Sequence, residues 1–188
     1  MPITHTNRKG WTYTLCQGST KTGKPRYFFA REPKGEVLDA VPEGCRIEES
    51  VNGVVSLVKE RPTLIEPEES AAVEAALKLH PHGGNYRVTT KDNQIIVHEG
   101  LGAELGALFA VMGRTGQEAQ AFQLRSTRYT PIMRFVLYDH DKRLFGAERW
   151  HFSGSIDAWI GIGRMGRLDT LARAFIPALG TKAYFELD

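Results

Sequence analysis

Three consecutive residues, Asp139, His140 and Asp141, combine the acid, base and metal-binding side chains from which small active sites are built. Such a run could bind a divalent cation or supply a general base. It also lies between two strand-like segments, where aspartates commonly accept hydrogen bonds from the amides of their own turn. We favour the turn interpretation and keep these three residues as the only catalytic candidates.

The histidines of His80-Pro81-His82 could also bind a metal ion, but a structural zinc site needs four ligands. No third ligand lies at a recognisable spacing from them, and Cys16 and Cys45 are too far apart in sequence to form a CxxC pair. The two histidines are better explained as a solvated helix end. The sequence therefore predicts no metal site.

Two glycine-rich stretches have spacings typical of phosphate-binding turns. The first, GSTKTGKP at 18–25, nearly matches the P-loop pattern, but Pro25 replaces the hydroxyl residue that binds magnesium. A P-loop is followed by a helix, whereas the aromatic residues at 27–29 favour a strand. We therefore interpret this stretch as the connection of a β-hairpin.

The second stretch contains Gly161, Gly163 and Gly166, which have the spacing of the dinucleotide fingerprint GxGxxG. An amphipathic helix is predicted to follow, as in a cofactor-binding fold. The preceding chain, however, reads as successive hairpins, not as the βαβ units that such a fold requires. These glycines stay candidates for binding a phosphate-bearing ligand, and the sequence predicts no cofactor.

Charge is distributed unevenly, although the formal net charge of the 188-residue chain is only +2. Residues 1–31 contain six Lys or Arg and no Asp or Glu, whereas residues 32–69 contain four Lys or Arg and ten Asp or Glu. The two segments therefore have formal charges of +6 and −6. Such asymmetry can mark an anionic partner. The commoner arrangement is that the two segments neutralise each other within the fold.

Arginine is the preferred cation beyond residue 101, where nine Arg and two Lys occur. Arginine binds phosphate bidentately and stacks on planar groups, so these residues could form a phosphate-tracking surface with the N-terminal cations and aromatic residues. A bias in codon usage would produce the same excess. The residues predicted for the anion-binding surface are Arg8, Lys9, Trp11, Lys21, Lys24, Arg26, Arg143, Arg164 and Arg167.

The elements that would position these residues are mainly β-hairpins. Residues 132–152 read as two strands joined by a four-residue loop at 139–142, with Tyr138 opposite Arg143 and Gly146 opposite Phe135. Further hairpins are expected at 11–30, at 45–57 around a type I′ Asn52-Gly53 turn, and at 86–98, and a last strand at 183–187. A helix is expected at 67–80, where Pro67 suits the first turn and Val73, Ala76, Leu77 and His80 share the inner face. Further helices are expected at 101–113 and 167–179.

These elements predict an α+β fold in which antiparallel β-hairpins form one or two sheets packed against about three helices. The length fits a single compact domain, 1–188, with possible sub-lobes 1–65 and 66–188. The N-terminal residues show no signal-peptide pattern, and the most apolar stretch, 101–112, is too short to span a bilayer. With only two cysteines, the chain is expected to be a soluble cytoplasmic protein without membrane contact.

Two functions from different classes fit these features. The first is a non-enzymatic binding or accessory protein for an anionic partner, either nucleic acid or an acidic protein surface. The alternative is a small enzyme that binds a nucleotide or another phosphate-bearing ligand at the Gly161–Gly166 turn. The absence of a catalytic motif favours the first. The sequence does not decide the partner, the oligomeric state or the redox state of Cys16 and Cys45.

Overall fold

The computed structural model describes residues 1–102, 116, 122–123, 125–153 and 156–188. Of these residues, 45% lie in strands and 22% in helical segments, and the strands form three antiparallel sheets. The predicted α+β class, with about three helices packed on one or two sheets, is therefore wrong. The main reason is that residues 128–166, predicted as one hairpin and a turn, form three long strands.

Two α-helices lie in the described part of the chain, α1 (Pro67–Leu79) and α4 (Leu168–Phe175). Both were predicted, and the predicted inner face of α1 is confirmed by the burial of Val73 and Leu77. Almost all of the third predicted helix, at 101–113, lies outside the described residues. No helix in the described part is long and apolar enough to cross a membrane.

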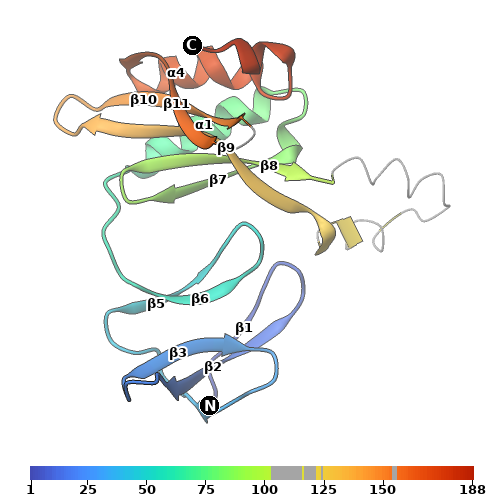
Figure 1. Cartoon of the computed structure of the whole chain (residues 1–188), viewed down its shortest axis with the longest axis vertical. Helices are drawn as coiled ribbons and strands as arrows, with labels where there is room; N and C mark the ends of the chain where they lie inside the picture. The colour runs from blue at the N-terminus through green and yellow to red at the C-terminus, as the bar shows by residue number, and fades with distance from the viewer. Residues whose placement is uncertain (103–115, 117–121, 124, 154–155) are drawn as a thin grey trace. The chain divides into compact units, whose positions relative to one another are not determined.

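The chain folds into two compact units (Figure 1). Unit 1 comprises Met1–Arg61 and Gly102–Arg128, and unit 2 comprises Pro62–Leu101 and Tyr129–Asp188. The predicted single domain, with possible sub-lobes 1–65 and 66–188, stays a prediction.

Unit 1 contains two small sheets. In the first sheet β2 pairs with β1, β3 and β4, and in the second sheet β5 pairs with β6. Leu15 and Cys16 of β2 are completely buried, and the thiols of Cys16 and Cys45 are free. The strands of unit 1 are β1 (Thr4–Thr6), β2 (Thr12–Ser19), β3 (Pro25–Ala30), β4 (Glu36–Val37), β5 (Cys45–Glu49) and β6 (Val55–Lys59).

The hairpins predicted around residues 11–30 and 45–57 are confirmed, as is the interpretation of residues 18–25 as a hairpin connection. The type I′ turn at Asn52-Gly53 is wrong, because a type I′ turn needs positive φ at both central residues. Gly53 has a φ of 77°, but Asn52 is not in the positive region. The amide of Gly53 instead donates to the carbonyl of Ser50, which starts the turn one residue earlier.

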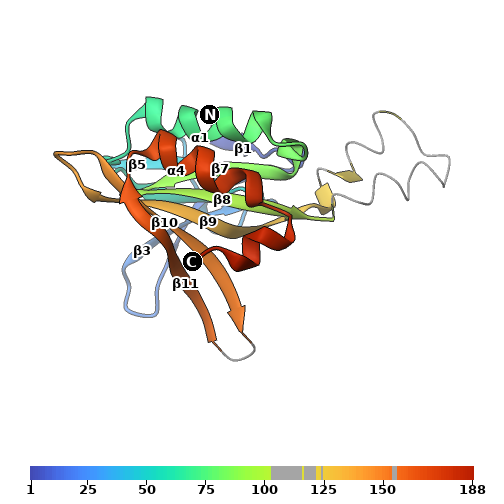
Figure 2. The same cartoon turned by 90° about the horizontal axis from the view of Figure 1, so that it is seen from above.

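Unit 2 is a five-stranded antiparallel sheet in the order β11-β10-β9-β8-β7, with α1 and α4 lying side by side over one face (Figure 2). Its core lies between the helices and this face, where Val73, Phe135 and Ala172 are buried. The 3-10 helices η1 (Gly83–Asn85) and η2 (Ile176–Ala178) follow α1 and α4. The strands of unit 2 are β7 (Tyr86–Lys91), β8 (Gln94–Leu101), β9 (Arg128–Asp139), β10 (Leu144–Ser153) and β11 (Ile156–Gly166).

The register of the β9–β10 hairpin differs by one residue from the predicted one. Phe145 pairs with Leu137 and Gly146 with Val136, because the turn occupies residues 140–143 and the register shifts after Leu144. A slip of one residue moves every side chain to the other face of a sheet. The observed register places Phe145 in the core and Glu148 on the opposite face, whereas the predicted register would have done the reverse.

The predicted last strand at 183–187 is also wrong, because residues Lys182–Glu186 form the 3-10 helix η3. Side chains hold this segment against the sheet. The buried Tyr184 donates its hydroxyl hydrogen to the carbonyl of Ile132, and Nε of Arg149 donates to the carbonyl of Leu187 over 2.9 Å. These two bonds replace the backbone pairing that a strand would have made.

Candidate functional site

The six predicted anion-binding residues of unit 1 form two groups at opposite ends of β2. The first group, at the turn between β1 and β2, consists of Arg8, Lys9 and Trp11. The second group, which we term the cationic tip, lies at the β2–β3 hairpin and consists of Lys21, Lys24 and Arg26. The eight residues of β2 separate the two groups by about 26 Å. The structure therefore does not bring all six together.

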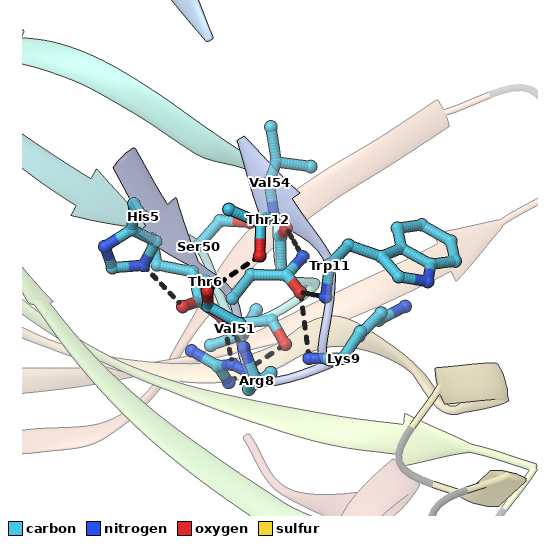
Figure 3. A network of polar contacts seen from close by, with 12 residues as sticks. His5, Thr6, Arg8, Lys9, Trp11, Thr12, Ser50, Val51 and Val54 are labelled. Carbon is cyan, nitrogen blue, oxygen red and sulfur yellow. Dashed lines mark hydrogen bonds and ion pairs between the residues drawn. The ribbon is translucent and has the colours of Figure 1, made fainter. Parts of the chain in front are cut away.

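Arg8 is neutralised inside unit 1 (Figure 3). Its Nε donates to Oε1 of Glu49 over 2.7 Å, and its backbone N–H donates to the same oxygen over 3.0 Å. Its Nη1 also donates to the carbonyl of Val51 over 3.1 Å, and Nε2 of His5 lies 3.1 Å from the other carboxylate oxygen of Glu49. Glu49 thus joins the β1–β2 turn to the β5–β6 hairpin, and the charge of Arg8 is taken up within the fold.

The pKa of Glu49 is set by two opposing effects. Burial acts to raise this pKa, but hydrogen bonds from the backbone amide of Arg8, from His5 and from the Arg8 guanidinium together lower it below its usual value. Glu49 is therefore ionised at neutral pH, which completes the ion pair with Arg8.

Asn7 fixes the same two turns and was missed by the sequence analysis. It is only 3% exposed, and its Nδ2 donates to the carbonyl of Gly53 over 2.6 Å. Its Oδ1 accepts hydrogen bonds from the backbone N–H groups of Lys9 and Trp11 at 3.1 and 2.9 Å (Figure 3). The sequence could have predicted a turn at Asn7, because Asn is common in turns. It could not have predicted the bond to Gly53, which lies 46 residues away.

The cationic tip is a hydrogen-bonded turn that carries exposed charges. The backbone N–H of Thr20 donates to the carbonyl of Lys24 over 2.8 Å, and the hydroxyl oxygen of Thr20 accepts the N–H of Lys24 over 3.1 Å. Gly23 has a φ of 78°, which favours glycine. Lys21, Lys24 and Arg26 are all exposed, and no Asp or Glu in the described part of the chain pairs with them.

Aromatic side chains lie near both groups in unit 1. Trp11 is 40% exposed, and the guanidinium carbon of Arg31 lies 4.8 Å from the centroid of its ring. Tyr27, the neighbour of Arg26 in β3, is 36% exposed. Because Tyr27 follows Arg26 directly in β3, the two side chains lie on opposite faces of the sheet.

The three predicted cations of unit 2 are held in different ways. Nε of Arg143 donates to Oε1 of Glu69 over 2.9 Å, and its Nη2 pairs with the second carboxylate oxygen. These hydrogen bonds raise the pKa of Arg143 above its ordinary value. They also connect the β9–β10 turn to α1. Arg164 lies exposed in β11, and Arg167 precedes α4, where its Nε lies 3.9 Å from Oδ1 of Asp169.

The catalytic candidates Asp139, His140 and Asp141 lie at the β9–β10 turn, as expected for a hairpin tip. Oδ1 of Asp139 accepts the N–H of Lys142 over 2.9 Å, which stabilises the turn itself. His140 and Asp141 are exposed and lie 3.7 Å apart. Across the described residues, no group of three or more His, Cys, Asp or Glu has the arrangement of a metal site.

The glycines of the GxGxxG pattern lie within strand β11, not in a turn. Gly163 has a φ of 65°, and a Cβ built on it would lie 2.7 Å from Cζ of Phe175. The register between β10 and β11 shifts at this point, between Phe145 and Ala147. Gly163 therefore allows a bulge and the close approach of a ring from α4.

A pocket of about 600 Å³ lies beside the C-terminal end of α1, lined by His80, Tyr86 and Arg87 among others. The polar groups of these residues already bond within the protein. Nε2 of His80 lies 3.1 Å from the carbonyl of Leu179, and its Nδ1 accepts the N–H of His82. The prediction of a solvated helix end is thus wrong for His80, which is buried. Burial and Glu99 raise the pKa of Tyr86 to about 12, so its hydroxyl stays protonated.

A polar cluster on the other face of the unit 2 sheet was also missed. It consists of Arg134 and Tyr138 from β9 and Glu148 from β10, with Tyr138 and Arg134 both bonded to the Glu148 carboxylate. The available signal was the pair Arg134 and Tyr138, which flank the three apolar residues at 135–137. The one-residue error in register placed Glu148 on the wrong face and hid the cluster.

Comparisons of the chain with protein-family models, with curated proteins and with solved structures found no match.

Proposed function

We propose that this protein is a non-enzymatic binding protein that contacts nucleic acid through the cationic tip of unit 1. The observation that supports this proposal is a difference between cations of the same basic segment. Arg8 is paired with Glu49, whereas Lys21, Lys24 and Arg26 are exposed and have no carboxylate partner within the described chain. Neutralisation within the fold accounts for Arg8 and leaves the cationic tip available.

The chemistry of the cationic tip suits a phosphate backbone. Lys and Arg side chains bind phosphate oxygens, and the hydrogen bonds of Thr20 with Lys24 hold the turn before any partner binds. Preorganisation lowers the entropy that binding would otherwise cost.

Charge removal at the tip tests the proposal. We expect a variant with Lys21, Lys24 and Arg26 replaced by Gln to bind fluorescein-labelled DNA and RNA at least about tenfold more weakly at low ionic strength. The matched control replaces Arg46, Lys59 and Arg61, three exposed cations of β5, β6 and the segment after β6, by Gln. It has the same change in charge and should retain most of the affinity.

Fluorescence anisotropy gives both affinities, and a urea melt of each variant checks that the fold is intact. Equal losses in the two variants would mean that only net charge matters, which contradicts a specific tip. A protein that binds polyglutamate but no DNA or RNA would have an acidic protein surface as its partner instead.

A further inference from the structure

The face of the unit 2 sheet that lies away from the helices carries a second set of chemistry-bearing side chains. Met133, Phe135 and Leu137 point into the core, so Arg134 and Tyr138 point to the opposite face. Glu148 pairs directly with Arg134 across β9 and β10 and shares this face. None of the predicted site residues belongs to it.

Tyr138 is held in place at two points. Its hydroxyl donates to Oε1 of Glu148 over 2.6 Å, and its ring occupies the space above Gly146, where a Cβ would lie 2.6 Å from Cε2 of the ring. Arg134 completes the arrangement, because its Nε donates to Oε2 of the same carboxylate over 2.7 Å. Tyr138 is nevertheless 58% exposed, so a fixed ring faces outward.

Three more aromatic residues share this face. Trp150 pairs with Trp159 across β10 and β11, with ring centroids 5.1 Å apart and an interplanar angle of 72°. The guanidinium carbon of Arg134 lies 4.4 Å from the centroid of the Trp159 ring. Phe152, two residues beyond Trp150 in β10, is 75% exposed. We term Tyr138, Trp150, Phe152 and Trp159 the aromatic face.

Charges of both signs lie on this side of the sheet, beside the aromatic rings. The carboxylate of Glu148 is neutralised by Arg134 at 2.5 Å. Lys91 of β7 is exposed on the same side of the sheet, and so is Asp157 of β11, which pairs with Phe152. Fixed aromatic rings with cations nearby are the features by which proteins bind single-stranded nucleic acid.

We propose that the aromatic face stacks the unpaired bases of a single-stranded nucleic acid, with Tyr138 as a main stacking residue. This inference rests on the nucleic-acid binding of the proposed function, but not on the cationic tip, and it adds the kind of nucleic acid and the surface that contacts its bases. Single strands fit because a paired base does not present its face to a protein ring. Glu148 and Arg134 act as positioning residues that hold the rings of Tyr138 and Trp159.

The test replaces Tyr138 by Leu and measures binding to a labelled oligothymidylate of about 20 nucleotides and to a duplex. Loss of one stacked base should weaken single-strand binding about 5- to 100-fold and leave the salt dependence unchanged, because no phosphate contact is lost. Tyr138→Phe keeps the ring over Gly146 and should stay within about threefold of the wild type. Phe185→Leu, at another exposed aromatic residue of unit 2, is the matched control and should bind normally.

A second measurement does not depend on the stability of a Tyr138 variant. The chain has three Trp residues, so in Trp11→Phe all tryptophan fluorescence comes from Trp150 and Trp159. Saturation with oligothymidylate should quench this fluorescence, because stacking places bases against the rings. Absence of quenching at saturation would overturn the inference.

The outcomes separate the two proposals. If Tyr138→Leu binds single strands as the wild type does, the aromatic face is not a base-stacking site, and the cationic tip can still be correct. If Tyr138→Leu binds weakly while the cationic-tip variant binds normally, the tip proposal fails and the aromatic face stands. If the wild-type protein binds no single strand at low ionic strength, base stacking on the aromatic face is contradicted. If it binds an apolar peptide at this face instead, the face is a protein-docking surface.

Discussion

Arg8 and Glu49, which are 41 residues apart in sequence, meet with Nε of Arg8 2.7 Å from Oε1 of Glu49. This pair links the basic segment 1–31 to the acidic segment 32–69. Neutralisation between the segments is therefore confirmed at Arg8. It does not extend to the cationic tip within the described residues, and this difference is what makes the tip a candidate binding surface.

Replacement of Glu49 by Gln should lower the free energy of unfolding by about 1–2 kcal/mol, because two charge-assisted hydrogen bonds to Arg8 are weakened. The neighbouring ion pair of Glu48 with Arg46 is about half exposed. Glu48→Gln is therefore the matched control, with an expected change below about 0.5 kcal/mol. Urea unfolding of the two variants checks this. Equal values for both would show that the Glu49 contacts add nothing to stability.

The contribution of Glu49 should also depend on pH. The pKa of Glu49 is lower in the folded chain than in the unfolded chain. Its stabilising effect is therefore complete above the pKa of the unfolded chain, about 4.3, and is lost as the pH falls through the pKa of the folded chain. The stability difference between the wild type and Glu49→Gln should therefore be constant near neutral pH and shrink below about pH 4.3. Urea melts across this pH range measure the stability difference between the two proteins. A difference that persists at acid pH would contradict the lowered pKa of Glu49.

Gly163→Ala should destabilise unit 2 by about 1–3 kcal/mol, because the new Cβ would lie against the Phe175 ring in a strained backbone conformation. Gly161 is the control within the same pattern. Nothing lies within 4 Å of a Cβ built on it, so Gly161→Ala should change stability by less than about 0.5 kcal/mol. Thermal melts distinguish the two. Similar effects at both positions would contradict the bulge as the reason for the glycine pattern.

Local signals predicted part of the fold, and long-range pairing explains the rest. Pro67 and the spacing of Val73 and Leu77 predicted α1, since these features act within one helix. The register of β9 with β10 was wrong by one residue because nothing local reveals the shift after Leu144. That error concealed the partnership of Tyr138 with Glu148.

The candidate site was predictable to a similar extent. The composition of residues 1–31 identified the basic segment, and the cationic tip follows from the confirmed hairpin at 18–25. Which cations are neutralised depends on contacts such as Arg8 with Glu49, which join residues far apart in sequence. Only the fold shows these contacts.

His80→Ala should lower the free energy of unfolding by about 1–3 kcal/mol, because the carbonyl of Leu179 and the amide of His82 would lose their partner. The exposed side chain of His82 provides the control, since His82→Ala keeps that amide and should cost less than about 0.5 kcal/mol. Chemical denaturation measures both. A larger loss at His82 would mean that the bridge from α1 to Leu179 is not what holds this end of the helix.

The salt dependence of nucleic-acid binding tests the central claim most directly. A plot of log affinity against log salt concentration reports the number of phosphate contacts, with about 0.7 units of slope per contact for a single strand. Loss of the three contacts made by Lys21, Lys24 and Arg26 should flatten the slope of the wild type by about 2 units, whereas the control at Arg46, Lys59 and Arg61 should retain the wild-type slope. Equal slopes for the wild type and the cationic-tip variant would contradict the account.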